Sequence, residues 1–522
     1  MKKDKTASAA PEEKLNYKRT FLIGFGFMGC MTLWSVYNSY VPVILRGKLT
    51  EIWRGDGAFM QFLSTHSWMS WLSVALVVNA IMTIDNIFGV IFQPYFGKKS
   101  DHTHTKMGKR MPYILIFLPL CAFAFSFIPV AATVKATGLS ILLMMSVIIC
   151  FNFMMSIWRS PVVSLMPDFT PSHLQSDANA VINIMGGIGQ MLGFVVGIIA
   201  STVVGLLGFT ALSDSLKAST DDFGRIIDDA GELVLDAAGN AQYVNYTPVF
   251  VVTACISVLC LVVLTIFYKK NKKYDLSAEV GFENGDTEKK KEKIKIKNLP
   301  ITKEEKRSLL VMLAALFLIN NATEAIVPNF TNFANGTLRV APIYSTLMMA
   351  VFAVSLAAFG IPAGVMGRKL GRKKTIMIGL TAIVAMFAVY LTVSQILPPA
   401  ADGSVNKFTW IILWIALIVG GAAVGCVNIN TLPLVLAIGG REYVGTFTGY
   451  YYTATMSASV TGPILCGLVI GLFNEDYNYM FLFCAVMFAI GLAVISGVKH
   501  GELSKDEDTT WLDEAVEEAD RD

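Results

Sequence analysis

The sequence predicts an all-α membrane protein with twelve transmembrane helices in two pseudo-symmetric six-helix bundles. Of the 522 residues, 54% are hydrophobic and only 16% are charged, and the mean hydropathy is +0.56, far from the balance of a soluble domain. Windows such as 112–131 and 139–158 contain no Asp, Glu or Lys, whereas Lys and Arg gather in short polar breaks. In addition, a Gly-basic-basic turn occurs at equivalent positions of the two halves.

Apolar windows long enough for a helix to cross a bilayer occur twelve times. We expect the first six spans near residues 20–45, 68–96, 112–134, 138–166, 180–208 and 247–268. The other six are expected near 308–333, 342–366, 373–397, 408–438, 443–473 and 478–498. No small-residue cleavage motif follows the polar N-terminus, so the first apolar stretch is interpreted as a spanning helix and not as a signal peptide.

Polar segments of opposite charge predict which side of the membrane each faces. Residues 269–307 hold thirteen Lys or Arg and eight Asp or Glu, whereas loop 209–246 has seven acidic residues and only Lys217 and Arg225 as basic ones. Because Lys and Arg are enriched on the cytoplasmic side, we expect residues 269–307 in the cytoplasm and the loop outside. The expected domains are a cytoplasmic tail (1–19), an N-terminal six-helix bundle (20–268), a cytoplasmic linker (269–307), a C-terminal six-helix bundle (308–498) and an acidic cytoplasmic tail (499–522).

Composition and motifs exclude several classes of function. The net charge of +3 comes largely from loop lysines and forms no basic domain for nucleic acid. The eight cysteines lie in apolar spans without the spacing of a zinc or haem site, and we interpret them as packing residues. His102 and His104 have no third metal ligand nearby. Since no motif of a hydrolase, metalloprotease or nucleotide-binding enzyme occurs, we expect neither enzymatic activity nor a cofactor or metal site.

Two glycine-containing turns follow spans 2 and 8, a duplication typical of secondary transporters. Their glycines and charged residues are Gly97, Asp101, Gly108, Lys109 and Arg110 in the first half, and Gly364, Arg368, Gly371 and Arg372 in the second. Asp101 is a candidate latch, because a carboxylate at a helix end can bond helix N-termini and basic side chains and release them when the halves move. The alternative is a solvated acid paired with Lys109 or Arg110. Arg368 takes the acidic position of the second turn, so we expect weaker gating there.

Three ionisable residues lie inside spans, where a charge is costly and requires a partner or a function. Asp85 lies near the middle of span 2, and Glu324 lies in span 7 with Asn320 one turn before it and Thr331 two turns after it. We expect this face of span 7 to line a cavity, because amides facing lipid would be unsatisfied. Asp85 and Glu324 are candidates for binding the coupling cation; the alternative for each is a neutral packing acid.

Arg159 lies toward the cytoplasmic end of span 4, on the same helix face as Asn152. One interpretation is an arginine that extends to the membrane interface. The other is an arginine that pairs with Asp85 or Glu324 and exchanges with a proton for that partner. We therefore include Arg159 among the candidate coupling residues.

Amides and aromatic rings recur on the expected helix faces. The candidate ligand-binding residues are Trp34, Tyr37 and Asn38 in span 1, Asn86 and Gln93 in span 2, Asn183 and Gln190 in span 5, Asn320 in span 7, and Tyr451 and Tyr452 in span 11. Sugars need hydroxyl partners and aromatic planes against their apolar faces, and these residues supply both. The alternative is that single members only join helices, as amides in membranes often do. Together they favour a polar, neutral ligand over a lipophilic one.

The loop after span 2, from Ser100-Asp101-His102 to Gly108-Lys109-Arg110, resembles the signature loop of the major facilitator superfamily. Its extended form is similar to that of the glycoside-pentoside-hexuronide:cation symporters, particularly the branch that carries sucrose and maltose with protons. Other segments with this resemblance are Trp158-Arg159-Ser160-Pro161, Leu165-Met166-Pro167-Asp168-Phe169-Thr170-Pro171, Asn179-Ala180, Asn183-Ile184-Met185-Gly186-Gly187, Thr448-Gly449-Tyr450-Tyr451-Tyr452, Gly462-Pro463 and Gly467. By position, Asp85 resembles the cation-site aspartate of that family.

The resemblance implies cation-coupled sugar uptake by alternating access, with a proton or sodium as the cation and a disaccharide such as maltose or sucrose as the substrate. It also implies a monomer in the plasma (inner) membrane. Two departures are His102 and Lys109, which stand where the branch usually has arginines, and loop 209–246, which is long. That loop could alter substrate access, bind something outside or be disordered. Alternative functions are an exporter of drugs or metabolites and, more remotely, a transporter-like sensor.

Overall fold

The computed structural model describes residues 15–53, 71–103, 105–134, 137–170, 175–228, 231–236, 239–275, 302–397, 405–439 and 444–499. The helices of the first half are α1 (Tyr17–Trp53), α3 (Val74–Met82), α4 (Ile84–Asp101), α5 (Met111–Ala132), α6 (Thr137–Phe169), α7 (Gln175–Leu206), α8 (Thr210–Lys217) and α9 (Thr247–Asn271), followed by the 3-10 turn η3 (Lys272–Tyr274). Those of the second half are α10 (Lys303–Leu338), α11 (Pro342–Leu370), α12 (Arg372–Ile396), α13 (Lys407–Gly439), α14 (Val444–Leu472) and α15 (Tyr479–Ser496). Two short strands, β1 (Ser219–Thr220) and β2 (Ile226–Ile227), lie between α8 and α9.

Twelve helices of the described chain are long and apolar enough to cross a membrane, at the positions that the hydropathy predicts. The second span, Val74–Asp101, consists of α3 and α4 and is interrupted at Thr83. Local sequence signals explain several helix starts: Pro stands in the first turn of α5, α9 and α11, and Thr302 forms a capping box with Glu305 at the start of α10. The predicted fold class is confirmed.

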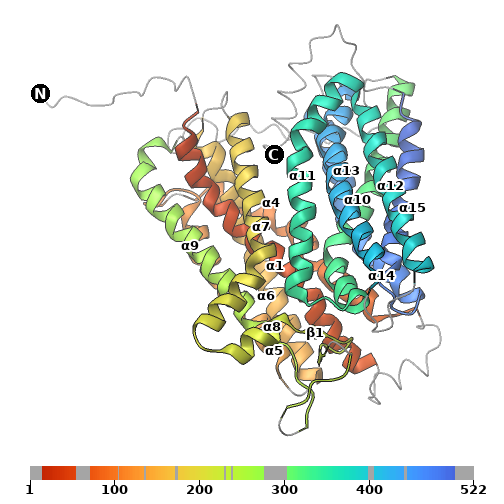
Figure 1. The fold of residues 1–522 in the computed structure, drawn as a ribbon. Coiled ribbons are helices and arrows are strands. Elements are labelled where there is room, and N and C mark those ends of the chain that lie inside the picture. Colours follow the sequence, from red (N-terminus) through yellow and green to blue (C-terminus); the bar gives the residue numbers. More distant parts are fainter. Residues whose placement is uncertain are drawn as a thin grey trace, which may run out of the picture.

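The helices form two bundles, each with its own apolar core (Figure 1). In the first bundle, α1 packs against α7 and α9, and α5 packs against α6; in the second, α10 packs against α14 and α15, and α13 packs against α11 and α12. The α1–α7 contact is so close that a Cβ atom on Gly189 would lie 2.3 Å from the Met28 carbonyl oxygen. Small residues are expected at such contacts, because apolar burial does not drive helices together in lipid.

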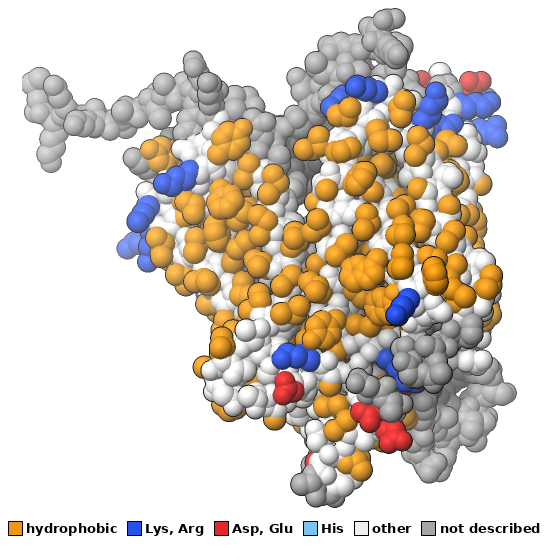
Figure 2. All heavy atoms as spheres, in the orientation of Figure 1, with side chains coloured by type: hydrophobic (Ala, Val, Ile, Leu, Met, Phe, Trp, Pro, Cys, Tyr) orange, Lys and Arg blue, Asp and Glu red, His pale blue; other side chains and the backbone are white. Residues whose placement is uncertain are grey.

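The two ends of the bundles differ in charge and in contact. We call the end that carries residues 207–246 the loop end, and the end that carries residues 98–110 and 368–374 the basic end. In Figure 2, apolar side chains cover the middle of the visible face, and Lys and Arg gather toward the basic end. Figure 1 shows the bundles converging at the loop end and diverging toward the end where α1 starts.

Hydrogen bonds join the bundles from their middle to the loop end. Asn79 of α3 bonds Asn329 of α10, and Tyr40 of α1 lies 3.4 Å from the Thr346 hydroxyl of α11. Toward the basic end, by contrast, Asn183 and Gln190 of α7 are exposed. The structure therefore has a closed loop end and a more open basic end.

The acidic loop after α7 is folded in its described part. Strand β1 pairs with β2 antiparallel, with Ser219 opposite Ile227. The loop repeats an Asp-x-x-Gly pattern, starting at Asp221, Asp228 and Asp236. Each of these carboxylates accepts the backbone N–H four residues later, at 2.8 to 2.9 Å, and each glycine has a positive φ. The interpretation of this loop as disordered is wrong for these residues.

Parts of the predicted domains lie outside the described residues. They include residues 1–14 of the N-terminal tail, 276–301 of the linker and 500–522 of the C-terminal tail, and also His104 of the predicted histidine pair. The domain boundaries beyond the helix limits stay a prediction.

Candidate functional site

Asp85 lies in the first turn of α4, directly after the interruption at Thr83. Its side chain is 4% exposed, and its Oδ1 accepts the N–H of Asn86 at 2.6 Å. The charges of Arg159 on α6 and Glu324 on α10 both act on this carboxyl. Asp85 therefore lies within electrostatic reach of the other two predicted coupling residues.

Glu324 belongs to the second bundle. Its helix, α10, packs against α14 and α15 and also contacts α1 and α3 of the first bundle, yet the Glu324 side chain is exposed. Glu324 lies close enough to Asp85 of the first bundle for their charges to interact. An acid in this position can meet water or a ligand between the halves without facing lipid.

Arg159 is half-buried, and its guanidinium lies over the ring of Trp34, 4.5 Å from the ring centroid. This is the geometry of a cation–π contact. Within the described residues, no carboxylate forms a salt bridge with Arg159. The pairing with Asp85 or Glu324 that the sequence suggested is therefore an interaction at longer range in this conformation.

Tyr37 lies on α1, one turn after Trp34. Its ring is fully buried and stacks on Phe151 with the centroids 5.2 Å apart, and its hydroxyl accepts the Asn152 amide at 3.1 Å. Asn152, which is absent from the set of ligand candidates, thus orients one of them.

The predicted ligand-binding amides have different surroundings. Asn183 and Gln190 are exposed and Asn38 and Gln93 are half-buried, so these four can meet a ligand. Asn86 donates to the Ser459 carbonyl across the bundle interface at 3.3 Å, and Asn320 donates to the Leu316 carbonyl of its own helix at 2.9 Å.

Tyr451 and Tyr452 are half-buried on α14, with their rings edge to face at 5.4 Å. By contrast, two amides on which sequence reasoning placed no binding role, Asn321 and Asn329, are buried and bond the other helices directly. An amide that joins helices and a more accessible amide can therefore share one helix, as Asn86 and Gln93 do on α4.

The turn after α4 is organised around Arg110. Its guanidinium pairs with Asp101, bonds Asp168 of α6 at 3.0 Å and donates to the Gly97 carbonyl at 3.4 Å. Burial alone would lower the pKa of Arg110, but the neighbouring carboxylates of Asp168 and Asp101 outweigh burial and raise this pKa above its usual value. Arg110 stays charged and ties the end of α4 to the end of α6.

Gly108 has a φ of +83°, and a Cβ atom there would lie 1.8 Å from the Tyr268 hydroxyl of α9. This hydroxyl donates to Asp275 at 2.8 Å. Glycine is required here both by the backbone conformation and by the contact with α9. Lys109 is half-buried beside it.

The second turn is arranged differently. Arg368 is exposed, and Gly371 has a φ of +97° between α11 and α12. Arg372 and Gly364 are half-buried. Lys373, the next residue, donates to the carbonyls of Ser496 and Val498 at 2.8 and 2.6 Å and so fastens this turn to the end of α15.

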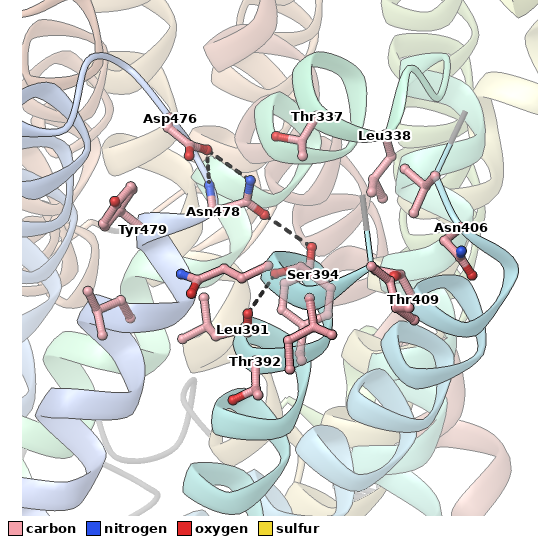
Figure 3. A pocket seen from close by; sticks show the side chains of 16 residues that line it. Thr337, Leu338, Leu391, Thr392, Ser394, Asn406, Thr409, Asp476, Asn478 and Tyr479 are labelled. Atoms are coloured by element: carbon pink, nitrogen blue, oxygen red, sulfur yellow. Dashed lines mark hydrogen bonds between the residues drawn. The ribbon is translucent and has the colours of Figure 1, made fainter. Parts of the chain in front are cut away.

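A cavity of about 660 Å³ lies elsewhere, at the loop end of the second bundle (Figure 3). Ends of α10, α12, α13 and α15 surround it. Its polar groups pair with one another: Tyr390 donates to Asn478 at 3.2 Å, and Asn478 donates to Asp476 at 2.9 Å. None of the residues selected from the sequence lines this cavity.

The charged cluster between two six-helix bundles, with amides on facing helices, is the arrangement of a transporter site at a repeat interface. The sequence profile of a family described as MFS/sugar transport protein matches residues 22–435. The chain belongs to this family. It is a secondary transporter of the major facilitator superfamily and not an enzyme.

Solved transporter structures share the fold of this sugar-transport family member. They include a bacterial homologue of the iron transporter ferroportin in an inward-facing state, with a TM-score of 0.61, 10% identity and coverage of 92% of this chain and 99% of that chain. A peptide transporter, POT, in complex with sulfate has a TM-score of 0.57, 12% identity and coverage of 94% and 97%. The nucleoside transporter NupG has a TM-score of 0.53, 14% identity and coverage of 92% and 100%. A comparison with curated proteins finds no match.

Proposed function

We propose that this transporter takes up a sugar together with a cation, most simply a proton, by alternating access between its two bundles. The observation that carries the proposal is the buried carboxylate of Asp85, directly after the break in the second span and near Arg159 and Glu324. Two acids and one base inside membrane spans are costly unless they bind something. A proton or another cation on Asp85 would relieve this cost.

The substrate is a neutral, polyhydroxylated molecule, and a disaccharide such as maltose or sucrose fits the family resemblance. Exposed or half-buried amides on α1, α4 and α7 offer donors and acceptors, and Trp34, Tyr451 and Tyr452 offer aromatic planes. The residues 97, 101, 108, 109 and 110 act as a gate at the basic end, with a weaker counterpart at 364, 368, 371 and 372.

In this proposal the protein is a monomer in the plasma (inner) membrane. Its basic end faces the cytoplasm, because Lys and Arg are enriched on that side of a membrane. With this orientation, the closed loop end and the more open basic end describe an inward-facing state. The bound sugar and cation leave from this state toward the cytoplasm.

Uptake into liposomes containing the purified protein tests the proposal. Radiolabelled maltose and sucrose are offered with an imposed proton gradient, with an imposed sodium gradient and with neither. Accumulation driven by one of the gradients is expected, and accumulation that ignores both would refute cation coupling. Asp85→Asn should abolish accumulation while leaving exchange of labelled for unlabelled sugar, because exchange needs no net cation movement. Full accumulation by this variant would remove Asp85 from the mechanism.

A further inference from the structure

Arg46, near the loop end of α1, is a buried arginine that joins several elements. Its Nη2 lies 2.7 Å from Asp222 of the loop after α7, and its guanidinium lies over the Tyr477 ring at 4.5 Å. A third contact runs from its Nη1 to the Asn332 carbonyl of α10 at 3.4 Å. Arg46 therefore links its own bundle to two segments of the other one.

The loop after α7 bonds the second bundle directly. Asn335 of α10 donates to the Thr220 hydroxyl at 2.8 Å and accepts the Thr220 N–H at 3.3 Å. The Ser219 hydroxyl donates to the Arg339 carbonyl, just after α10. Thr220 and Asn335 are 1% and 2% exposed, so water does not compete for their paired hydrogen bonds.

The same loop is fastened to its own bundle. Besides the ion pair with Arg46, Tyr243 donates to Glu51 of α1 at 3.3 Å, and a Cβ atom on Gly47 would lie 3.0 Å from the Phe223 carbonyl. One folded segment is thus fixed to α1 on one side and to α10 on the other. It spans the seam along which the bundles must part if the loop end opens.

Buried polar atoms along this seam favour opening of the loop end. Within the described residues, the Asn332 amide, the Ser39 hydroxyl and the Tyr477 hydroxyl have no hydrogen-bond partner, although all three are buried. Ser39 lies on the same face of α1 as Arg46, seven residues before it. Each atom loses hydration when the loop end closes and regains it when the loop end opens.

We propose that residues 207–246 are an outer clamp that holds the loop end closed against this desolvation cost. The clamp thereby sets the balance between the inward-facing and outward-facing states, a role that rests on the proposed alternating access. The bonds from Thr220 to Asn335 of α10 and from Ser219 to Arg339, just after α10, must break before the loop end opens. Weakening them shifts the protein toward the outward-facing state. Locking them stops transport.

Distances between spin labels measure this balance without any substrate. Labels replace Leu206 and Ile396, exposed residues at the loop end of α7 and α12, in a background where the exposed Cys150 and Cys255 are serine. Asn335→Ala is expected to raise the population with the longer distance severalfold. Asn240→Ala is the matched control, because among the described residues Asn240 bonds only Asp236, inside the clamp.

The outcomes separate the clamp from the transport mechanism. If the wild type shows two distances between the labels and Asn335→Ala leaves their populations unchanged, the clamp alone is overturned. A single distance in the wild type under all conditions overturns alternating access and the clamp together. A second variant, Thr220→Cys with Asn335→Cys, tests the clamp by locking it, so the result does not depend on a weakened fold. Its oxidation should abolish uptake reversibly with reductant, and full uptake by the cross-linked protein overturns the clamp.

Discussion

The side-chain amides of Asn79 and Asn329 donate to each other across the bundle interface, at 2.9 and 2.8 Å. Each is 1% exposed, so the pair is shielded from water. Each amide also donates to a carbonyl of its own helix, Ala75 for Asn79 and Ala325 for Asn329. The pair therefore fixes α3 to α10 with no unsatisfied amide hydrogen.

Replacing Asn329 by alanine leaves the buried amide of Asn79 without its partner. We expect Asn329→Ala to lower the free energy of unfolding by about 1–3 kcal/mol, the cost of an unsatisfied buried polar group. Asn79→Ala should cost a similar amount, and the double variant less than the sum of the two. Thermal unfolding in detergent measures this. The control is Asn271→Ala, because among the described residues its amide bonds only the Phe267 carbonyl of its own helix. Additive effects of the two substitutions would contradict the pairing.

Glu324→Gln keeps the size of the side chain and removes its charge from the neighbourhood of Asp85. If Glu324 takes part in coupling, the variant should lower gradient-driven sugar accumulation by about tenfold or more while its unfolding temperature stays near that of the wild type. The control is Glu304→Gln, an exposed acid in the first turn of α10. Equal accumulation by both variants would exclude Glu324 from the coupling.

Gly108→Ala should destabilise the protein by roughly 1–3 kcal/mol, because alanine is strained at this positive φ and meets the Tyr268 hydroxyl. Removing the hydroxyl in Tyr268→Phe should make the same substitution less costly, since only the backbone strain remains. The matched control is Gly138→Ala in α6, where no atom lies within 4 Å of the added Cβ. Equal unfolding temperatures for Gly108→Ala and the wild type would contradict the contact.

The carboxyl of Glu475, at the loop end, should make the stability of the protein depend on pH. Burial raises the pKa of this carboxyl, and the N–H groups of Ala75 and Val74 and the charge of Arg46 oppose this only in part. The folded protein thus binds this proton more tightly than the unfolded chain. Its contribution to stability is complete below the usual glutamate pKa of about 4.3 and is lost as the pH rises through the raised value.

Glu475→Gln should therefore gain stability relative to the wild type as the pH rises across that window. Unfolding temperatures measured from pH 4 to pH 8 test this, with the exposed acid Glu232 changed to glutamine as the control. A difference between Glu475→Gln and the wild type that is the same at every pH would contradict the prediction.

The spans were predictable because hydropathy is a local property, and each span begins and ends within several residues of its expected position. The first span is the main exception: its apolar window ends before Arg46, but α1 continues to Trp53. The helix extends because Arg46 contacts Asp222, Tyr477 and the Asn332 carbonyl. These partners lie 176 or more residues away in sequence. No local pattern reports such partners.

The ionisable candidates were predictable for a similar reason, since a charge within an apolar span is visible in the sequence. Their geometry was not: the contact of Arg159 with Trp34 depends on how α6 packs against α1. The order of the loop after α7 did have a local signal, the repeated Asp-x-x-Gly turns. The acidic composition of this loop favours disorder, whereas the spacing of its Asp and Gly residues favours ordered turns.

Very few residues of one bundle belong to the apolar core of the other. The core of the second bundle includes Ala75 and Phe194 from the first, and the core of the first includes Ala341 and Ile343 from the second. During synthesis, the first six spans can therefore form most of their apolar core before the ribosome has finished α10. Two polypeptides divided within residues 276–301 and produced in one cell should then assemble into a working transporter.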